Sequence, residues 1–140
     1  MKDIEIAKEY LKEEDVAIAV VKDGKLIFKS NEKGIKPMYT IAMEMMNTLD
    51  KASIADKVIG KGAAILCKYM GIKDVHGQLM SASAIDFLEK TGIGYTYEKS
   101  CPYIENMDRT DLCPIERLAM DIEDGNILLD RIGKFIQGLS

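Results

Sequence analysis

The chain has 140 residues, of which 47% are hydrophobic and 30% are charged. This length suits one ordinary domain, so we expect residues 1–140 to fold as a single unit. The balance of apolar and charged residues excludes a disordered chain and a collagen-like one. The formal net charge of −4 offers no general attraction for nucleic acids, and we expect no nucleic-acid polymer among the partners.

Cysteine usage and the N-terminus indicate a cytoplasmic protein. Cys67, Cys101 and Cys113 are odd in number, and no two of them have the CxxC spacing. Residues 1–5 (MKDIE) are charged and do not resemble a signal peptide. Reduced thiols in a cytoplasm are the natural interpretation. No apolar run approaches the length of a membrane span, so we expect no membrane partner.

The first half of the chain predicts a helix, a hairpin and two further helices. The spacing and length of the apolar runs indicate helix 3–13, strands 16–21 and 26–28, helix 38–49 and helix 54–70. Asp23 and Gly24 stand between the two strands and are typical of a tight hairpin turn. Pro37 is well placed to begin the second helix, and Gly71 to end the third.

The second half alternates strands with helices. The expected elements are strand 73–79, a helix capped by Ser81 or Ser83 that ends near Lys90, strand 93–98, a helix from Pro114 and a helix over 126–138. Strands that alternate with helices of this length imply crossover connections and a partly parallel sheet. Residues 99–112 have no regular period and are rich in polar groups, as functional loops often are.

The order of these elements resembles the cytidine-deaminase-like fold. Two stretches, 55–64 (ADKVIGKGAA) and 113–116 (CPIE), are similar to a small prokaryotic family of uncharacterised proteins with that fold. The resemblance implies an α/β domain with three layers, α/β/α, around a mixed sheet of four to five strands that opens with an antiparallel hairpin. It marks a family and implies no particular chemistry.

The resemblance also tells where zinc ligands would lie. Zinc-dependent deaminases carry a His or Cys followed by Ala-Glu at the start of one helix, and Pro-Cys-x-x-Cys at the start of the next crossover helix. The corresponding stretches of this chain, 56–61 and 80–84, contain neither Cys nor His. A structural or catalytic zinc site needs at least three protein ligands. We therefore expect no metal, no cofactor and no zinc-dependent deamination.

The first candidate site is the start of the predicted helix 54–70. Asp56 with Gly60, and Lys57 with Lys61, form two i,i+4 pairs on adjacent faces. A helix N-terminus offers free N–H groups and a positive dipole end, so an anion can bind there with help from the lysines. The alternative is a solvated first turn, in which the small residues serve only the packing of the helix on the sheet.

The second candidate is the polar loop around Arg109. The guanidinium of Arg109 can hold a carboxylate or phosphate through two hydrogen bonds, while Asn106 and Thr110 can contact a polar ligand. The alternative is a system of Asx turns in which Arg109 pairs with Asp108 or Asp111.

The third candidate is Cys113, which precedes Pro114 at a predicted helix start. The helix dipole there would lower the pKa of the thiol, and Glu116 stands at capping-box distance. The alternative is a buried, inert cysteine. His76, the single histidine, is interpreted as a structural residue of its strand.

Three functions follow from these candidates. The leading hypothesis is a binding domain for a small anionic, nucleotide-like metabolite, held at the start of helix 54–70. The second is an enzyme or redox protein that uses Cys113. The third is an oligomeric structural or regulatory module, with a homodimer formed through the methionine-rich helix 38–49 and the final helix.

Overall fold

The computed structural model describes residues 2–32, 34–104 and 114–138. Its elements follow in the order α1 (Asp3–Leu11), β1 (Ile18–Lys22), β2 (Lys25–Ser30), α2 (Lys36–Glu44), α3 (Met46–Leu49), β3 (Ser53–Ile59), α4 (Lys61–Tyr69), β4 (Asp74–Ser81), α5 (Ala82–Thr91), β5 (Gly94–Cys101), α6 (Pro114–Ala119) and α7 (Gly125–Gly138). In these ranges, no helix is long and apolar enough to cross a lipid bilayer.

The strands of the described ranges form one mixed sheet with the order β2-β1-β3-β4-β5. β1 pairs antiparallel with both β2 and β3, whereas the pairs β3–β4 and β4–β5 are parallel. The hairpin turns at Asp23 and Gly24, whose φ angles are 52° and 80°. These positive angles are what the Asp-Gly pair predicts. The predicted fold class, an α/β domain whose mixed sheet opens with an antiparallel hairpin, is confirmed.

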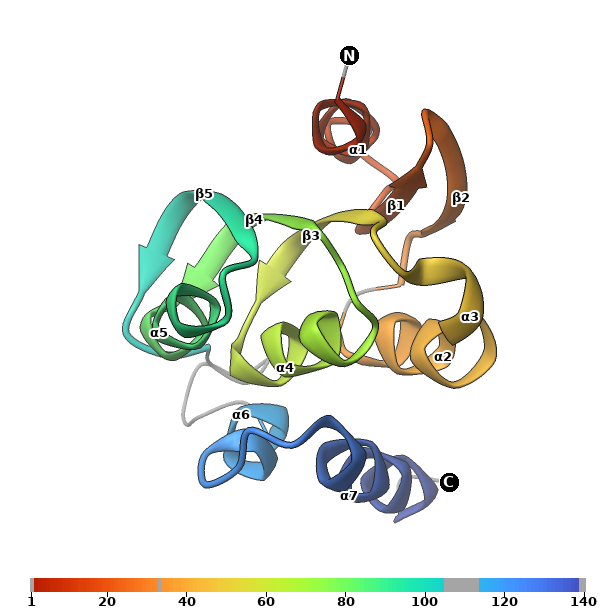
Figure 1. Ribbon diagram of the computed structural model, residues 1–140. Helices are drawn as coiled ribbons and strands as arrows, with labels where there is room; N and C mark the ends of the chain where they lie inside the picture. The colour runs from red at the N-terminus through yellow and green to blue at the C-terminus, as the bar shows by residue number, and fades with distance from the viewer. Residues whose placement is uncertain (1, 33, 105–113, 139–140) are drawn as a thin grey trace.

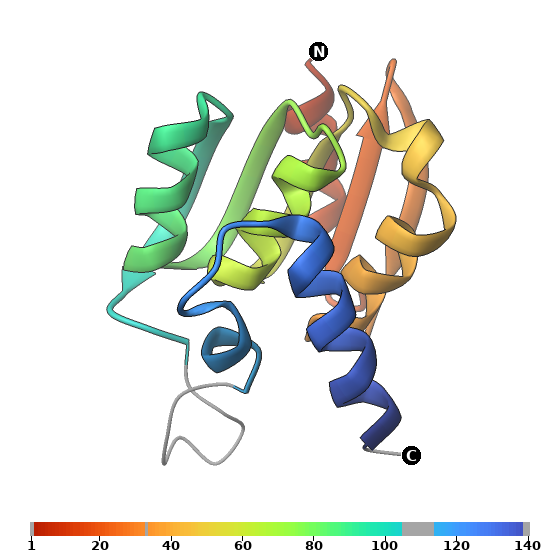
Figure 2. The same ribbon diagram turned by 60° about the horizontal axis from the view of Figure 1, so that its bottom comes forward.

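Helices cover both faces of this sheet (Figure 1). On one face, Ala7 of α1 packs in a cluster with Ala19 and Ala55 of β1 and β3. On the other face, α2, α4 and α5 close the main core around Ile54 and Leu66. α6 and α7 lie beyond α4, on the side away from the sheet (Figures 1 and 2). The apolar run 16–21 is continuous because both faces of β1 are buried.

The predicted helix 54–70 is wrong in its first third. Ser53–Ile59 forms the central strand β3, Gly60 is the N-cap, and helix α4 begins only at Lys61. The error has a physical reason: Ile54 and Val58 are four residues apart, a spacing that fits both the helical period and the even period of a strand. The correction places Asp56 and Lys57 on a strand, and it supplies the strand that joins the hairpin to the parallel pairs.

The predicted helix 38–49 is two helices, α2 and α3. They separate at Met45, whose φ of −121° and ψ of 13° lie outside the helical region. The remaining predicted elements differ from the observed ones by a few residues at their ends, and the helix predicted from Pro114 is α6, which ends at Ala119.

Candidate functional site

A small pocket lies where β3 ends and α4 begins. Its volume is about 80 Å³, and its described lining consists of Gly34, Ile35, Asp56, Val58, Gly60, Gly62, Ala63, Ile104, Ile115 and Glu116. Two of these residues are acidic, and the others are glycines or apolar residues. The carboxyl edge of parallel strands is the usual position of ligand sites in open α/β sheets.

Asp56 brings one carboxyl group to this pocket. It stands on β3 opposite Ile18 of β1 and Gly77 of β4, near the middle of the sheet. Burial raises the pKa of the Asp56 carboxyl to about 7, although backbone N–H groups of Val58 and Lys57 hydrogen-bond to it and oppose the shift. The bond from the Val58 N–H measures 3.2 Å. A carboxyl group of this kind exchanges its proton near neutral pH, as general acids and bases do.

Glu116 brings the second carboxyl group, and it comes from the first turn of α6. Its side chain is buried, and the backbone N–H of Lys61 donates a hydrogen bond of 2.6 Å to its Oε1. The hydroxyl of Ser83 donates a longer bond of 3.5 Å to Oε2. Gly60, the N-cap of α4, has no side chain to cap the helix, so Glu116 supplies the cap from 55 residues away.

The glycines at the start of α4 make room for α6. A Cβ atom on Gly60 would overlap the Glu116 carboxylate, and one on Gly62 would lie 2.8 Å from Cγ2 of Ile115. The two stretches that mark the family resemblance, 55–64 and 113–116, therefore meet in space at Gly60 and Glu116. These contacts join α4 to α6, whereas the alternative predicted for the small residues is the packing of their helix on the sheet.

The two lysines of the predicted site do not line the pocket. The Lys57 Nζ donates to the Glu14 carbonyl oxygen at 3.3 Å, and the Lys61 Nζ donates to the Met120 carbonyl oxygen at 3.2 Å. The expected pairing of Asp56 with Gly60, and of Lys57 with Lys61, on the faces of one helix start is wrong, because β3 runs through residues 56 and 57.

Several predicted site residues lie outside the described residues: Asn106, Arg109, Thr110 and Cys113. The loop site and the reactive thiol therefore stay predictions. Of the described cysteines, Cys67 is buried in α4, where burial and the Asp56 charge raise the pKa of its thiol. Such a thiol is inert toward nucleophilic chemistry. Cys101 lies with its Sγ 3.9 Å from the Met80 carbonyl oxygen.

His76 lies apart from the pocket. It stands in register with Ala55, which packs on the α1 side of the sheet, whereas Asp56 lines the pocket on the other side. Its Nδ1 is 2.7 Å from the Thr96 hydroxyl, and its Nε2 is 3.3 Å from a carboxylate oxygen of Glu98. Both ring nitrogens thus have fold partners, as the structural interpretation of His76 implies.

Sequence reasoning missed part of the pocket. Gly34, Ile35 and Ile104 line it but belong to segments with no recognisable motif. Ser83 was considered as a helix cap, yet Ser81 is the residue whose Oγ accepts the Ala84 N–H, and Ser83 contacts Glu116 instead. Among the described residues, no three His, Cys, Asp or Glu side chains cluster closely enough to hold a metal ion.

Fold and site together define an α/β domain with a small acidic pocket at the carboxyl edge of its sheet. The chain belongs to the TM1506 family, described as a domain of unknown function (DUF1893), which matches residues 6–136. The predicted membership in a family of unknown function is thus confirmed. The fold is similar to the crystal structure of a DUF1893 family protein (TM1506) from Thermotoga maritima. The TM-score is 0.85 and the identity 22%, with 96% of this chain and 90% of that chain covered. No curated protein matches the chain.

Proposed function

We propose that this chain is a binding domain for a small metabolite, which enters the pocket between Asp56 and Glu116. The observation that supports this proposal is the composition of the described lining, in which two acidic residues stand among glycines and apolar residues. Sites for small molecules typically combine a mostly apolar wall with a few polar groups. The carboxyl edge of the sheet supports the same function.

The chemistry of the lining favours a ligand group that donates hydrogen bonds. Carboxylates accept such bonds, and no described lining residue carries a positive charge. The entering group is therefore neutral or cationic and bears N–H donors, as amidines and amino-substituted heteroaromatic rings do. In the anionic, nucleotide-like ligand expected from the sequence, the base is the part that fits this pocket, because Lys57 and Lys61 contact backbone carbonyls elsewhere.

Three probes of the same shape test the proposal: benzamidine, benzamide and benzoate carry a cationic, a neutral and an anionic group on one ring. We expect benzamidine to bind best at pH 8, benzamide more weakly and benzoate not at all. NMR titration of the ¹⁵N-labelled protein is the measurement, and the amide signals of Gly60, Gly62 and Ala63 are expected to shift. These amides belong to the pocket wall.

Matched variants locate the effect. Asp56→Asn is expected to weaken benzamidine binding about tenfold or more, because it removes a charge-assisted hydrogen bond. The control is Asp86→Asn on α5, whose side chain is exposed and does not line the pocket. Equal binding of benzoate and benzamidine, or signal shifts confined to other surfaces, would contradict the proposal.

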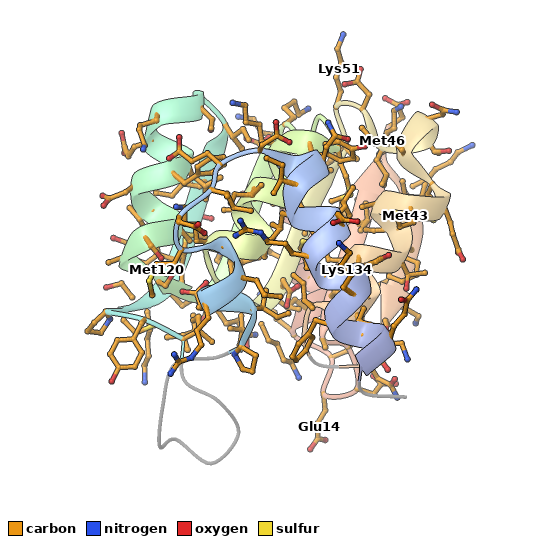
Figure 3. All side chains as sticks on the ribbon, turned by 90° about the horizontal axis from the view of Figure 1, so that it is seen from below. Glu14, Met43, Met46, Lys51, Met120 and Lys134 are labelled. Atoms are coloured by element: carbon orange, nitrogen blue, oxygen red, sulfur yellow. The ribbon has the colours of Figure 1, made fainter. Side chains whose placement is uncertain are left out.

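The second candidate function is that of an oligomeric module, with a homodimer formed where α2 and α7 line one hollow of about 310 Å³. These are elements of the two segments expected to make a subunit contact. Met43 is 59% exposed beside this hollow, and Figure 3 shows Met43 and Lys134 on the same side of the molecule. Exposed methionine is typical of protein contact surfaces.

Light scattering is expected to give twice the 15.6 kDa of one chain, and Met43→Glu to restore the single-chain mass. A single-chain mass for the unchanged protein at every concentration argues against it.

A further inference from the structure

Helix α6 is too short to be stable by itself. It spans Pro114–Ala119, six residues, whereas isolated helices need about twelve or more to persist in water. Its position must come from tertiary contacts. Among the described residues, groups outside α6 hold its two ends: the Lys61 N–H donates to Glu116 in the first turn, the Lys61 Nζ donates to the Met120 carbonyl oxygen, and Arg131 Nη1 donates to the Leu118 carbonyl oxygen at 3.0 Å.

These contacts give Lys61 two attachments to α6. Its backbone N–H meets the start of the helix, and its ammonium group meets the carbonyl just beyond the end. A cation at a helix C-terminus and a carboxylate at a helix N-terminus are both favourable for the helix dipole. The attachment at Glu116 involves a buried side chain, so its loss would leave a partly buried N–H group and a buried carboxylate without their bond.

The same helix forms part of the pocket wall, through Ile115 and Glu116. Ile115 sits against Gly62, and Glu116 against Gly60, so that wall is positioned by the docking of α6 on the start of α4. Glu116 also receives the Ser83 hydroxyl from the start of α5. One carboxylate thereby joins the first turns of three helices, α4, α5 and α6.

We infer that Glu116 is a positioning residue, which caps α4 and in doing so holds α6 as a wall of the ligand pocket. Its consequence for binding rests on the proposed function, whereas its effect on α6 does not. Glu116 acts through the placement of Ile115 and of the Lys61 backbone, and the ligand's donor group binds Asp56. The hydrogen bond from the Lys61 N–H requires a side chain long enough to place an acceptor oxygen there, more than it requires a negative charge.

Two conservative variants test whether the cap requires the length of the Glu116 side chain or its negative charge. Glu116→Gln keeps an acceptor oxygen at the same reach, while Glu116→Asp keeps the charge and shortens the side chain by one methylene. Hydrogen exchange of the backbone amides of Lys61 and Met120 is measured by NMR without ligand. We expect exchange at Lys61 to be about tenfold faster or more in Glu116→Asp, since a partly buried N–H loses its acceptor, and to stay within about threefold in Glu116→Gln. The Met120 amide, which bonds to Arg117 at the end of α6, follows the same pattern.

Benzamidine affinity is measured on the same proteins, with Glu123→Gln as the matched control. Glu123 follows α6 and forms an exposed ion pair with Lys90, so its charge can be removed without touching the cap. We expect Glu116→Asp to weaken benzamidine about tenfold and Glu123→Gln to leave it nearly unchanged. Glu116→Gln removes a charge from the pocket lining, so it is compared by hydrogen exchange alone. These results would support the inference.

The outcomes that overturn the inference differ from those that overturn the proposed function. If hydrogen exchange at Lys61 is unchanged in Glu116→Asp, Glu116 is not the cap of α4. If benzamidine affinity is unchanged although exchange is faster, Glu116 does not position the pocket wall. A Glu116→Gln protein whose Lys61 amide exchanges as fast as that of Glu116→Asp shows that the cap needs the charge and not the length of the side chain, which also overturns the inference. If the unaltered protein fails to bind benzamidine, the proposed ligand class fails, while the exchange pattern still decides whether Glu116 holds α6.

Discussion

The starts of α4 and α5 meet the same physical need in two different ways. Both helices follow strands that run parallel to each other, so both begin at the same edge of the sheet. α5 is capped locally: the Oγ of Ser81 accepts the N–H of Ala84 at 3.2 Å. α4 begins after Gly60, which has no side chain, and Glu116 of α6 provides the acceptor.

The difference shows what a distant cap adds. A serine cap stabilises its own helix and links it to nothing else in the chain. A cap that arrives from another helix requires glycines at the point of approach, and it fixes that helix in place. The pocket lies at the start of α4, where the cap is distant, and its wall is partly made by the helix that supplies the cap.

The sharpest test of this comparison is Gly60→Ala. Gly60 has φ of −97°, so alanine is not strained in the backbone, but its Cβ would overlap the Glu116 carboxylate. We expect a loss of about 3 kcal/mol in the free energy of unfolding, from overpacking together with the lost cap. Urea unfolding followed by circular dichroism is the measurement. Gly138→Ala, where a Cβ meets no atom within 4 Å, is the control and should be neutral. A Gly60→Ala protein as stable as the unaltered one would mean that α6 does not depend on this approach.

The Asp56 carboxyl at the α4 side should make the free energy of unfolding depend on pH, whereas Gly77 at the paired position on β4 has no side chain that titrates. Its pKa is about 7 in the folded protein and about 3.9 in the unfolded chain. The folded state therefore binds the proton more tightly, and the stability that protonation contributes is complete below about pH 4 and lost as the pH rises through 7.

Asp56→Asn, which keeps the shape and removes the titration, is accordingly expected to stabilise the protein at pH 8 and to have little effect at pH 4. The gain in the free energy of unfolding at pH 8 should be about 2 kcal/mol. A pKa shift contributes at most about 1.36 kcal/mol per unit, and we expect less than this because the side chain is only partly buried. Thermal unfolding at both pH values measures it. An equal change in melting temperature at pH 4 and pH 8 would be incompatible with a raised pKa.

The two caps can be compared directly through Glu116→Ala and Ser81→Ala. We expect losses of about 2 kcal/mol for Glu116→Ala, which leaves a partly buried N–H without its acceptor, and about 1 kcal/mol for Ser81→Ala. Only the first should also speed up hydrogen exchange in α6, at the amide of Met120. If Ser81→Ala disturbs α6 as much as Glu116→Ala does, the distinction between a local and a distant cap is lost.

The smallest effect is expected for the second attachment of α6. Lys61→Met keeps most of the aliphatic stem and removes the ammonium group that binds the Met120 carbonyl oxygen at 3.2 Å. We expect a loss of about 0.5 kcal/mol, because this contact lies near the surface. Lys57→Met, which removes the analogous bond to Glu14 on the other side of the sheet, serves as the control in urea unfolding. A loss from Lys61→Met that exceeds that of Glu116→Ala would reverse the ranking of the two attachments.

What could be predicted from the sequence also differs between the local cap of α5 and the distant cap of α4. The sequence narrows the cap of α5 to Ser81 or Ser83, because the acceptor and the N–H that it binds lie within three residues of each other. The start of α4 was misplaced because its cap is in another part of the chain, and because Ile54 and Val58 fit either period. The small residues at 60–64 and the stretch 113–116 were recognised separately, but their contact was not. Nothing in the local sequence says that Glu116 reaches Lys61.

The sequence by itself determined the α/β class, the opening hairpin and the alternation of strands and helices, because turn pairs, caps and apolar periods act over a few residues. It also singled out Asp56, Gly60 and Glu116 as residues of interest. Only the tertiary structure decided how they combine: Asp56 on a strand with a carboxyl pKa of about 7, and Glu116 as the cap of a helix 55 positions earlier. The physical reason is that burial and long-range hydrogen bonds depend on which segments meet in space, and that is decided by the packing of the whole chain.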